Sequence, residues 1–200
     1  MNIFRYGNTE IDHLKKRDKK LGRVIDEIGL IRRRVTPDLF TALVAGIAGQ
    51  QVSAKAAETV WKRMEERFGT ISPGAIAVAT TEEIQQCGMS MRKAGYIRGI
   101  ADAVLAGKLD LAGLFSLPDD EVVERLTAQN GVGIWTAEML LIFSMERPDV
   151  VSWGDLAIRR GMMRLYGRET LDRTDFLRFR KRYSPYGSVA SLYLWEIAHR

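Results

Sequence analysis

The chain has 200 residues, a hydrophobic content of 46% and a formal net charge of +5, which suffices for one substantial core or for two small lobes. No apolar run reaches the roughly 20 residues that a membrane-spanning helix needs, and the N-terminus lacks the apolar stretch of a signal peptide, so we expect a cytoplasmic protein with no membrane partner. One cysteine, Cys87, and two histidines, His13 and His199, exclude an internal disulfide and leave no plausible side-chain ligand set for zinc or an iron–sulfur cluster.

Apolar residues recur at helical spacing along almost the whole chain, as in Leu39, Leu43 and Ile47, and strand-like alternation is hard to find. The sequence therefore predicts an all-α protein of about ten short helices. Helix starts are expected where serine or threonine precedes a proline in the first helical position, or where a capping box occurs: Thr36-Pro37, Ser72-Pro73, Thr80 with Glu83, and Ser184-Pro185. Helix ends are expected at glycines: Gly29, Gly69, Gly88, Gly107 and Gly167.

The chain has no low-complexity linker, but a division into two lobes is possible. Residues 37–126 are expected to form one helical bundle. The N-terminal segment, residues 1–36, is expected to pack with a second lobe that contains residues 127–200. A cleft between two such lobes is a common place for a functional site.

Two adjacent amides, Gln50 and Gln51, stand between two apolar helices in the segment GQQVS, which ends at Ser53. They can cap the flanking helices. They can also form an exposed loop that probes base edges or fills the gap left by an extruded nucleotide. The residues alone leave this choice open.

A glycine-rich turn, Gln129–Gly133, joins two segments expected to be helical, Glu121–Ala128 and Ile134–Ser144. Its two glycines, Gly131 and Gly133, let the backbone adopt positive φ and approach another chain closely. The helix that follows offers unsatisfied N–H groups and a positive dipole end, which favour a phosphate oxygen. The alternative is a corner between helices that needs glycine only to turn.

A solitary carboxylate, Asp155, lies shortly after this hairpin, at the expected first turn of another helix. It can serve as a helix cap. It can also be an oriented, ionised carboxylate that stabilises a developing oxocarbenium at a sugar C1′ or helps to activate water. The nearest aromatics, Trp135 and Trp153, are either core residues or stacking platforms for a flipped base, whereas Trp61 and Trp195 lie on strongly amphipathic helices and are interpreted as core.

Basic residues are concentrated directly after this carboxylate. Between Leu156 and Arg182 there are nine of them, against three acids (Glu169, Asp172 and Asp175): Arg159, Arg160, Arg164, Arg168, Arg173, Arg178, Arg180, Lys181 and Arg182. Such an excess favours a polyanion as partner, although a solvated face on surface helices explains it equally well.

The segment NGVGIWTAEMLLIFSMERPDVVSWGDLAIRR resembles the helix-hairpin-helix, Gly/Pro-rich loop and catalytic aspartate of the DNA glycosylase superfamily (HhH-GPD). Two further segments, GQQVSAKAA and MSMRKAGYIRGIADAV, resemble its DNA-3-methyladenine glycosylase II branch. The three segments occur in the expected order and the similarity runs from Leu39 to the C-terminus. The resemblance implies a two-lobed helical fold with a DNA-binding cleft between the lobes and without the N-terminal β-rich lobe of some members.

The resemblance also implies roles for individual residues. Asp155 matches the catalytic aspartate. The residues expected at the DNA are Gln50, Gln51, Ser53, Asn130, Gly131, Val132, Gly133, Ile134, Thr136 and Arg159. The base pocket is expected to include Trp135 and Trp153. The hairpin is expected to grip phosphate through backbone amides, and relatives often hold a monovalent cation on hairpin carbonyls. Asn130 replaces the usual proline, and asparagine turns less rigidly.

Trp135 stands where bifunctional members carry a lysine that attacks the sugar. Without an amine nucleophile no Schiff base can form, so we expect water as the nucleophile, no lyase step and no cofactor. The implied function is a monofunctional DNA glycosylase of base excision repair. As a monomer, it would flip an alkylated purine (the 3-methyladenine and 7-methylguanine class) from double-stranded DNA and hydrolyse its N-glycosidic bond. The alternatives are a non-enzymatic helix-hairpin-helix DNA-binding module and a related glycosylase for deaminated or oxidised bases.

Overall fold

The computed structural model describes residues 2–200, which divide into two compact helical units. The hairpin unit comprises residues 36–140, and the aspartate unit comprises residues 2–35 together with residues 141–200. Residues 2–200 contain twelve α-helices, one 3-10 helix and no strand, only an isolated bridge between Ile3 and Arg34. This confirms the all-α prediction. No helix in this part of the chain is both long and apolar enough to cross a membrane.

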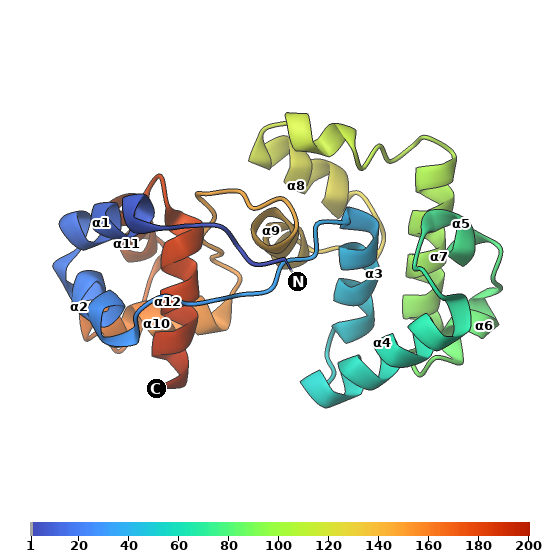
Figure 1. Cartoon of the computed structure of the whole chain (residues 1–200), viewed down its shortest axis with the longest axis horizontal. Coiled ribbons are helices and arrows are strands. Elements are labelled where there is room, and N and C mark those ends of the chain that lie inside the picture. The colour runs from blue at the N-terminus through green and yellow to red at the C-terminus, as the bar shows by residue number, and fades with distance from the viewer. Residues whose placement is uncertain (1) are drawn as a thin grey trace. The chain divides into compact units, whose positions relative to one another are not determined.

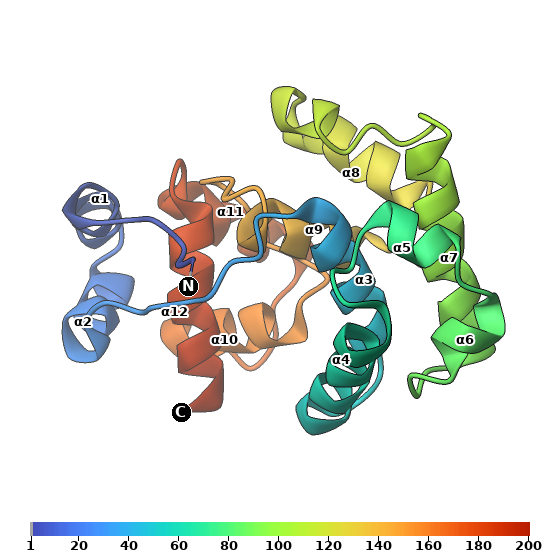
Figure 2. The same cartoon turned by 45° about the vertical axis from the view of Figure 1, so that its right-hand side comes forward.

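The hairpin unit is built around α3 and α7 (Figure 1). Its elements are α3 (Leu39–Gly49), α4 (Ala54–Phe68), α5 (Pro73–Ala77), α6 (Thr81–Gln85), α7 (Met91–Leu105), a 3-10 turn (Gly113–Ser116), α8 (Asp119–Thr127) and α9 (Ile134–Phe143), whose last residues belong to the other unit. Helices α3 and α4 pack together, and α5 and α6 pack on α7, as Figure 2 shows. The sequence predicts about ten helices, and the structure has twelve α-helices and one 3-10 helix within residues 2–200.

Helix boundaries follow the predicted caps where a side chain satisfies the first N–H groups. The Ser72 hydroxyl caps α5 with Pro73 in the first turn, and Thr80 with Glu83 forms the capping box of α6, as predicted. The prediction for Pro37 is wrong, because the Asp38 carboxylate accepts from the amide of Thr41 at 2.7 Å and makes Asp38 the N-cap.

The glycines expected at helix ends all adopt positive φ. Gly29, Gly69 and Gly167 are the C-cap residues of their helices, and Gly88 and Gly107 lie in the turns after α6 and α7. The prediction of helix ends from glycine is therefore confirmed.

In the aspartate unit, one buried helix packs against three others. The elements are α1 (Asn8–Arg17), α2 (Lys19–Ile28), α10 (Leu156–Tyr166), α11 (Arg173–Tyr183) and α12 (Gly187–His199). Helix α12, red in Figure 1, lies against α10, α2 and α11 and is buried from Gly187 to Leu194. Helices α10 and α12 approach closely because Gly161 has no side chain: a Cβ there would collide with the carbonyl of Leu194. Helix α12 begins after the predicted Pro185, since the Asp149 carboxylate accepts from the amide of Gly187 at 3.0 Å.

A buried carboxylate, Asp18, ties α2 to the C-terminal helices. One of its oxygens caps α2, and the other accepts from the Tyr166 hydroxyl at 2.6 Å and from the Arg182 guanidinium at 3.1 Å. Burial opposes the charged form, but these hydrogen bonds outweigh it and hold the pKa of Asp18 below its usual value. The N-terminal helices thereby belong to the same unit as α10 and α11.

The hairpin belongs to the first unit, whereas the sequence-based division grouped residues 127–200 together. The contacts of the turn explain this difference. The Gln50 amide donates to the carbonyl of Gly131 at 2.9 Å, and the ring of Tyr96 lies directly against Gly131. The hairpin is therefore held by α7 and by the loop after α3.

Candidate functional site

The hairpin presents main-chain groups at the start of a helix. Helix α8 ends at Thr127, the amide of Val132 donates to the carbonyl of Gln129 at 3.2 Å, and α9 begins at Ile134. The Val132 side chain is buried and anchors the turn, whereas Gly133 and Ile134 are exposed. The first N–H groups of a helix have no partner within that helix. The turn therefore offers exposed backbone where an anion can approach.

Only glycine fits at position 131. Its φ of 86° lies in the left-handed region, and a Cβ would overlap the ring of Tyr96. Gly133 differs, because its φ is not positive and a Cβ there would meet no atom within 4 Å. Gly131 is thus required for the turn itself, and Gly133 leaves open space for an approaching group.

The loop between α3 and α4 is fastened to the hairpin by one of its two amides. Besides the bond from the Gln50 side chain to Gly131, the ammonium of Lys93 donates to the carbonyls of Ala48 at 3.0 Å and Gln50 at 2.5 Å. Gln51 is exposed and has a φ of 55°, a strained conformation for a residue with a side chain. The structure thus separates the two amides: Gln50 holds the loop and Gln51 projects from it.

The remaining predicted residues of the hairpin unit fall into two groups. Ser53 caps α4 through its hydroxyl, and Thr136 is buried as a whole residue. Asn130 and Trp135 are exposed, the latter by 46%.

Asp155 is a buried carboxylate whose two oxygens are both held by donors. It is 6% exposed and is the N-cap of α10. Its Oδ1 accepts from the amides of Ala157 and Ile158 at 2.8 and 2.9 Å, and its Oδ2 accepts from the indole Nε1 of Trp195 at 3.2 Å. The capping role is therefore present, and the same contacts fix the orientation of the carboxylate.

The loop that leads to Asp155 is anchored on α12 by two buried serines. The Ser188 hydroxyl donates to the carbonyl of Arg147 and accepts from the amide of Val150 at 3.0 Å. The Ser191 hydroxyl donates to the carbonyl of Val150, also at 3.0 Å. Helix α12 thus positions the loop and, through Trp195, the carboxylate.

The sequence did not predict the aromatic pair that lies beside the carboxylate. The rings of Phe143 and Trp195 stack with centroids 5.5 Å apart at an interplanar angle of 30°, and neither residue is fully buried. Trp195, interpreted from the sequence as core, instead donates to Asp155. Its partner is 40 residues away in the chain, and no local pattern marks the contact.

Trp153 lies in a cationic environment. The guanidinium carbons of Arg159 and Arg173 lie 4.9 and 5.1 Å from its ring centroid, and the ring of Phe176 meets it edge-on at 5.1 Å. The Arg159 Nε is buried and makes no hydrogen bond within the described residues. Two of the predicted site residues, Trp153 and Arg159, are therefore in contact with each other.

The carbonyls of the hairpin are chemically suited to a monovalent cation, since hard cations prefer oxygen ligands. The carbonyls of Gln129 and Gly131 each accept one hydrogen bond, from Val132 and Gln50 respectively. A carbonyl oxygen has two lone pairs, so both retain capacity for a further interaction. The cation implied by the resemblance fits these residues.

Known proteins share both the sequence pattern and the fold. The family model described as HhH-GPD superfamily base excision DNA repair protein matches residues 44–182. DNA-3-methyladenine glycosylase 1 of Schizosaccharomyces pombe is 31% identical over 92% of this chain and 84% of that protein.

Two solved structures extend the comparison to the fold. The DNA-3-methyladenine glycosidase of Bacillus halodurans has 36% identity and a TM-score of 0.87, covering 99% of this chain and 93% of that one. The 3-methyladenine DNA glycosylase of Schizosaccharomyces pombe in complex with abasic DNA has 29% identity and a TM-score of 0.82, covering 94% and 96%.

A hairpin that offers main-chain groups and a capped carboxylate on a second helical unit define a two-lobed helix-hairpin-helix protein. The chain belongs to the HhH-GPD superfamily of base excision DNA repair proteins. The sequence-based identification of the family and of its fold is confirmed, and DNA is the partner that this family membership supports.

Proposed function

We propose that the protein is a monofunctional DNA glycosylase that removes alkylated purines, of the 3-methyladenine and 7-methylguanine class, from double-stranded DNA. The observation that carries the proposal is Asp155, a buried carboxylate that two amides of α10 and the Trp195 indole hold in one orientation. The names of the relatives, which are 3-methyladenine glycosylases, support the choice of substrate.

In the proposed reaction, the damaged nucleotide leaves the duplex and its sugar approaches Asp155. The carboxylate stabilises the oxocarbenium that develops as the N-glycosidic bond breaks, and water completes the hydrolysis. An alkylated purine such as 3-methyladenine is cationic, hence a good leaving group, so extrusion and electrostatic stabilisation supply most of what the enzyme must add. No redox or organic cofactor is required.

The aromatic neighbours of Asp155 supply a stacking surface for such a base. A cationic ring is attracted to an indole face, and the Phe143–Trp195 pair lies beside the carboxylate through the Trp195 hydrogen bond. Arg159 and Arg173 already lie over the Trp153 ring, which would repel a cationic base. We therefore favour Trp195 over Trp153 as the ring that stacks on the flipped base. The stacking by Trp135 and Trp153 that the sequence predicts stays a prediction.

The proposed DNA grip uses the backbone of the hairpin. Phosphate oxygens would bind the N–H groups at the start of α9, and the exposed Gln51 would enter the duplex where the nucleotide leaves. A protein that acts on one lesion needs no symmetric partner, so we propose that it works as a monomer.

A lesion panel tests the proposed substrate. Purified protein is incubated with duplexes that carry methylated, deaminated or oxidised bases, and released free base is measured by chromatography. The proposal predicts release of 3-methyladenine or 7-methylguanine. Binding without any released base would support the non-enzymatic DNA-binding module, and release of another base would support a different glycosylase.

Borohydride trapping tests the absence of a lyase step. A Schiff base between an amine and the sugar would be reduced to a stable covalent adduct. Because Trp135 occupies the position of the nucleophilic lysine, no adduct is expected on DNA from which the base is released. A trapped band would show that another amine attacks the sugar and would overturn the monofunctional assignment.

A further inference from the structure

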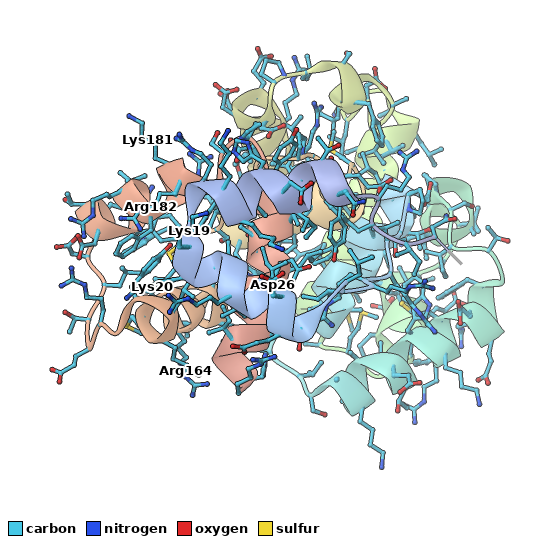
Figure 3. All side chains as sticks on the ribbon, turned by 60° about the vertical axis from the view of Figure 1, so that its left-hand side comes forward. Lys19, Lys20, Asp26, Arg164, Lys181 and Arg182 are labelled. Carbon is cyan, nitrogen blue, oxygen red and sulfur yellow. The ribbon has the colours of Figure 1, made fainter. Side chains whose placement is uncertain are left out.

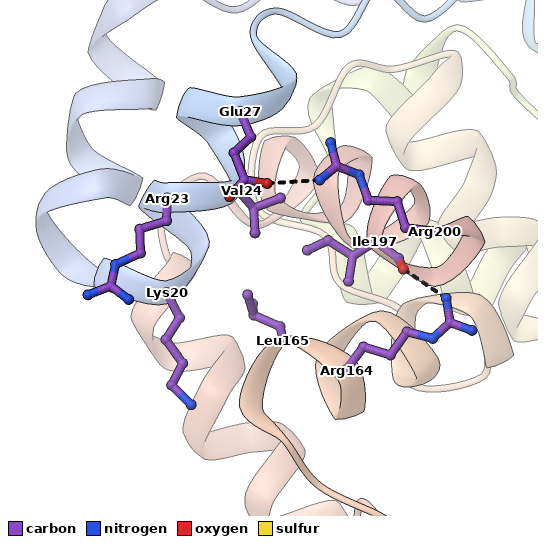
Figure 4. A pocket seen from close by; sticks show the side chains of 8 residues that line it. All are labelled: Lys20, Arg23, Val24, Glu27, Arg164, Leu165, Ile197 and Arg200. Atoms are coloured by element: carbon purple, nitrogen blue, oxygen red, sulfur yellow. Dashed lines mark hydrogen bonds and ion pairs between the residues drawn. The ribbon is translucent and has the colours of Figure 1, made fainter.

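Three surface hollows of the aspartate unit form a continuous series. The central one has a volume of about 640 Å³ and lies between α2, α10 and α12 (Figure 4). It shares Arg23 with a hollow along α1 and α2, and Arg164 with a hollow at the C-terminal end of α10. The shared residues make the three hollows one surface that crosses two helices.

Cationic side chains without carboxylate partners line this surface. We define the basic band as Lys19, Lys20, Arg23, Arg160, Arg164 and Arg168, all of them exposed. Within residues 2–200, none of these six forms an ion pair. Figure 3 shows Lys19, Lys20 and Arg164 along one side of the unit, with Lys181 and Arg182 continuing the series.

Two of the three acids that line this surface are already paired. Asp26 binds Lys15, and Glu27 binds Arg200 at 3.0 Å. Glu169 also lines the α10 hollow, where one acid faces the three arginines Arg160, Arg164 and Arg168. The six positive charges of the basic band therefore exceed the one unpaired acid at this surface, and like charges repel one another unless an anion binds.

The arrangement of two members suggests that their charges are held in place. The Arg164 Nη1 donates to the carbonyls of Ile197 and Ala198 at 3.2 and 2.9 Å, which fixes the guanidinium at the end of α12 (Figure 4). The Lys20 ammonium lies 3.4 Å from the carbonyl of Tyr166 and 5.9 Å from its ring centroid. Prepositioned cations lose less side-chain entropy when they bind an anion.

The basic band is separate from the proposed catalytic carboxylate. Asp155 caps the N-terminus of α10, whereas the nearest member of the band, Arg160, stands five residues later and Arg164 nine, about 7.5 and 14 Å along the helix at 1.5 Å per residue. None of the residues that hold Asp155 lines the three hollows.

We propose that the basic band is a second contact surface for the phosphate backbone of DNA. Its linear series of lysines and arginines fits an extended polyanion better than a small anion, which would need donors converging on one point. The phosphates come either from the flank of the bound duplex or from a second duplex.

The test compares two variants with the same loss of charge. The band variant is Lys20→Gln with Arg23→Gln. The control is Lys62→Gln with Lys108→Gln, two exposed lysines of the hairpin unit. Binding of undamaged duplexes of about 10 and about 40 base pairs, roughly one and four helical turns, is measured by fluorescence anisotropy as a function of salt, and excision on damaged DNA is measured in the same preparations.

If the contact is with the flank of the bound duplex, the band variant should bind the long duplex more weakly than the control does. Its salt slope should be lower by about 1.8, for two lost phosphate contacts. It should bind the short duplex as the control does. A second-duplex contact predicts that the short duplex binds at two per protein in wild type and one in the band variant. Slopes and stoichiometries equal to the control would overturn the proposal. A band variant that loses affinity for poly-aspartate but not for DNA would also overturn it and would indicate an acidic protein partner.

The proposal needs only DNA as partner, not the proposed chemistry. If wild type binds as expected but excises no base, the glycosylase assignment fails while the basic band stands. If excision is normal and the salt slopes of the two variants agree, the basic band fails and the glycosylase assignment stands.

Discussion

The hairpin unit and the aspartate unit use different parts of the polypeptide. In the hairpin unit the exposed groups are main-chain atoms, and the decisive residues are those that let the backbone turn, above all Gly131. In the aspartate unit the decisive group is a side chain, Asp155, whose position depends on donors from α10 and α12. A backbone site is therefore limited by the turn that its glycines permit, whereas a carboxylate site depends on distant partners.

The largest expected effect comes from changing the carboxylate of the aspartate unit. Asp155→Asn keeps a good N-cap for α10, because asparagine caps helices as well as aspartate does, but it removes the charge that would stabilise an oxocarbenium. Single-turnover excision of an alkylated base should fall by about 1000-fold, while the melting temperature stays close to wild type. Excision at the normal rate would remove Asp155 from the chemistry.

The second prediction sets two glycines of the hairpin against each other. Gly131→Ala must accommodate both a positive φ and the ring of Tyr96, so it should lower the free energy of unfolding by about 3 kcal/mol. Gly133→Ala has open space and should leave stability within about 0.5 kcal/mol of wild type. Chemical denaturation of both variants measures the difference, and equal stabilities would contradict the account of the turn.

The third prediction concerns the aromatic donor. Trp195→Phe removes the hydrogen bond to Asp155 but keeps a ring opposite Phe143. Losing one hydrogen bond to a charged group costs about 1.5 kcal/mol, so the single-turnover rate should fall roughly 10-fold with little change in duplex affinity. Trp61→Phe is the control and should behave like wild type, because the Trp61 indole donates to the exposed Glu65.

The smallest expected effect is on stability alone. The pKa of Asp18 is lowered in the folded state. Its charged form therefore stabilises the fold at pH values above the unfolded pKa of about 3.9. This stabilisation is lost as the pH falls through the lower folded pKa. Asp18→Asn should therefore cost about 1 kcal/mol at neutral pH and make unfolding less steeply dependent on pH below about 4.

Melting curves from neutral to acidic pH test this sign, with Asp26→Asn as the matched control, because Asp26 is exposed and its pair with Lys15 lies at the surface. Excision per folded molecule should be unchanged in both variants. A parallel pH dependence for wild type and Asp18→Asn would contradict the role of the buried carboxylate.

Local chemistry explains what could be predicted from the sequence. Positive φ at Gly29, Gly69 and Gly167 follows from glycine itself, and the cap at Asp155 follows from its place before an apolar run. These features depend on residues within a few positions of one another, so a linear pattern contains them.

Contacts distant in the chain explain what could not be predicted. Trp195 reaches Asp155 across 40 residues, and Gln50 reaches Gly131 across 81. Because of the first contact, Trp195 belongs to the candidate site and not to the core as predicted. Because of the second, the hairpin belongs to the unit of α3 and α7 and not to the C-terminal region as predicted. Neither contact produces a periodic pattern in the sequence, because each is a single hydrogen bond between segments that come together only in the fold.

The most direct test of the different roles of the two units compares Asp155→Asn with Gly133→Ala. For both variants, duplex affinity and single-turnover excision at saturating protein are measured. We predict that Asp155→Asn binds damaged duplex like wild type but releases the base about 1000-fold more slowly. Gly133→Ala, whose added methyl group occupies the space left for a phosphate, should bind more weakly yet release the base at the wild-type rate once saturated. Loss of the same property in both variants would contradict the account.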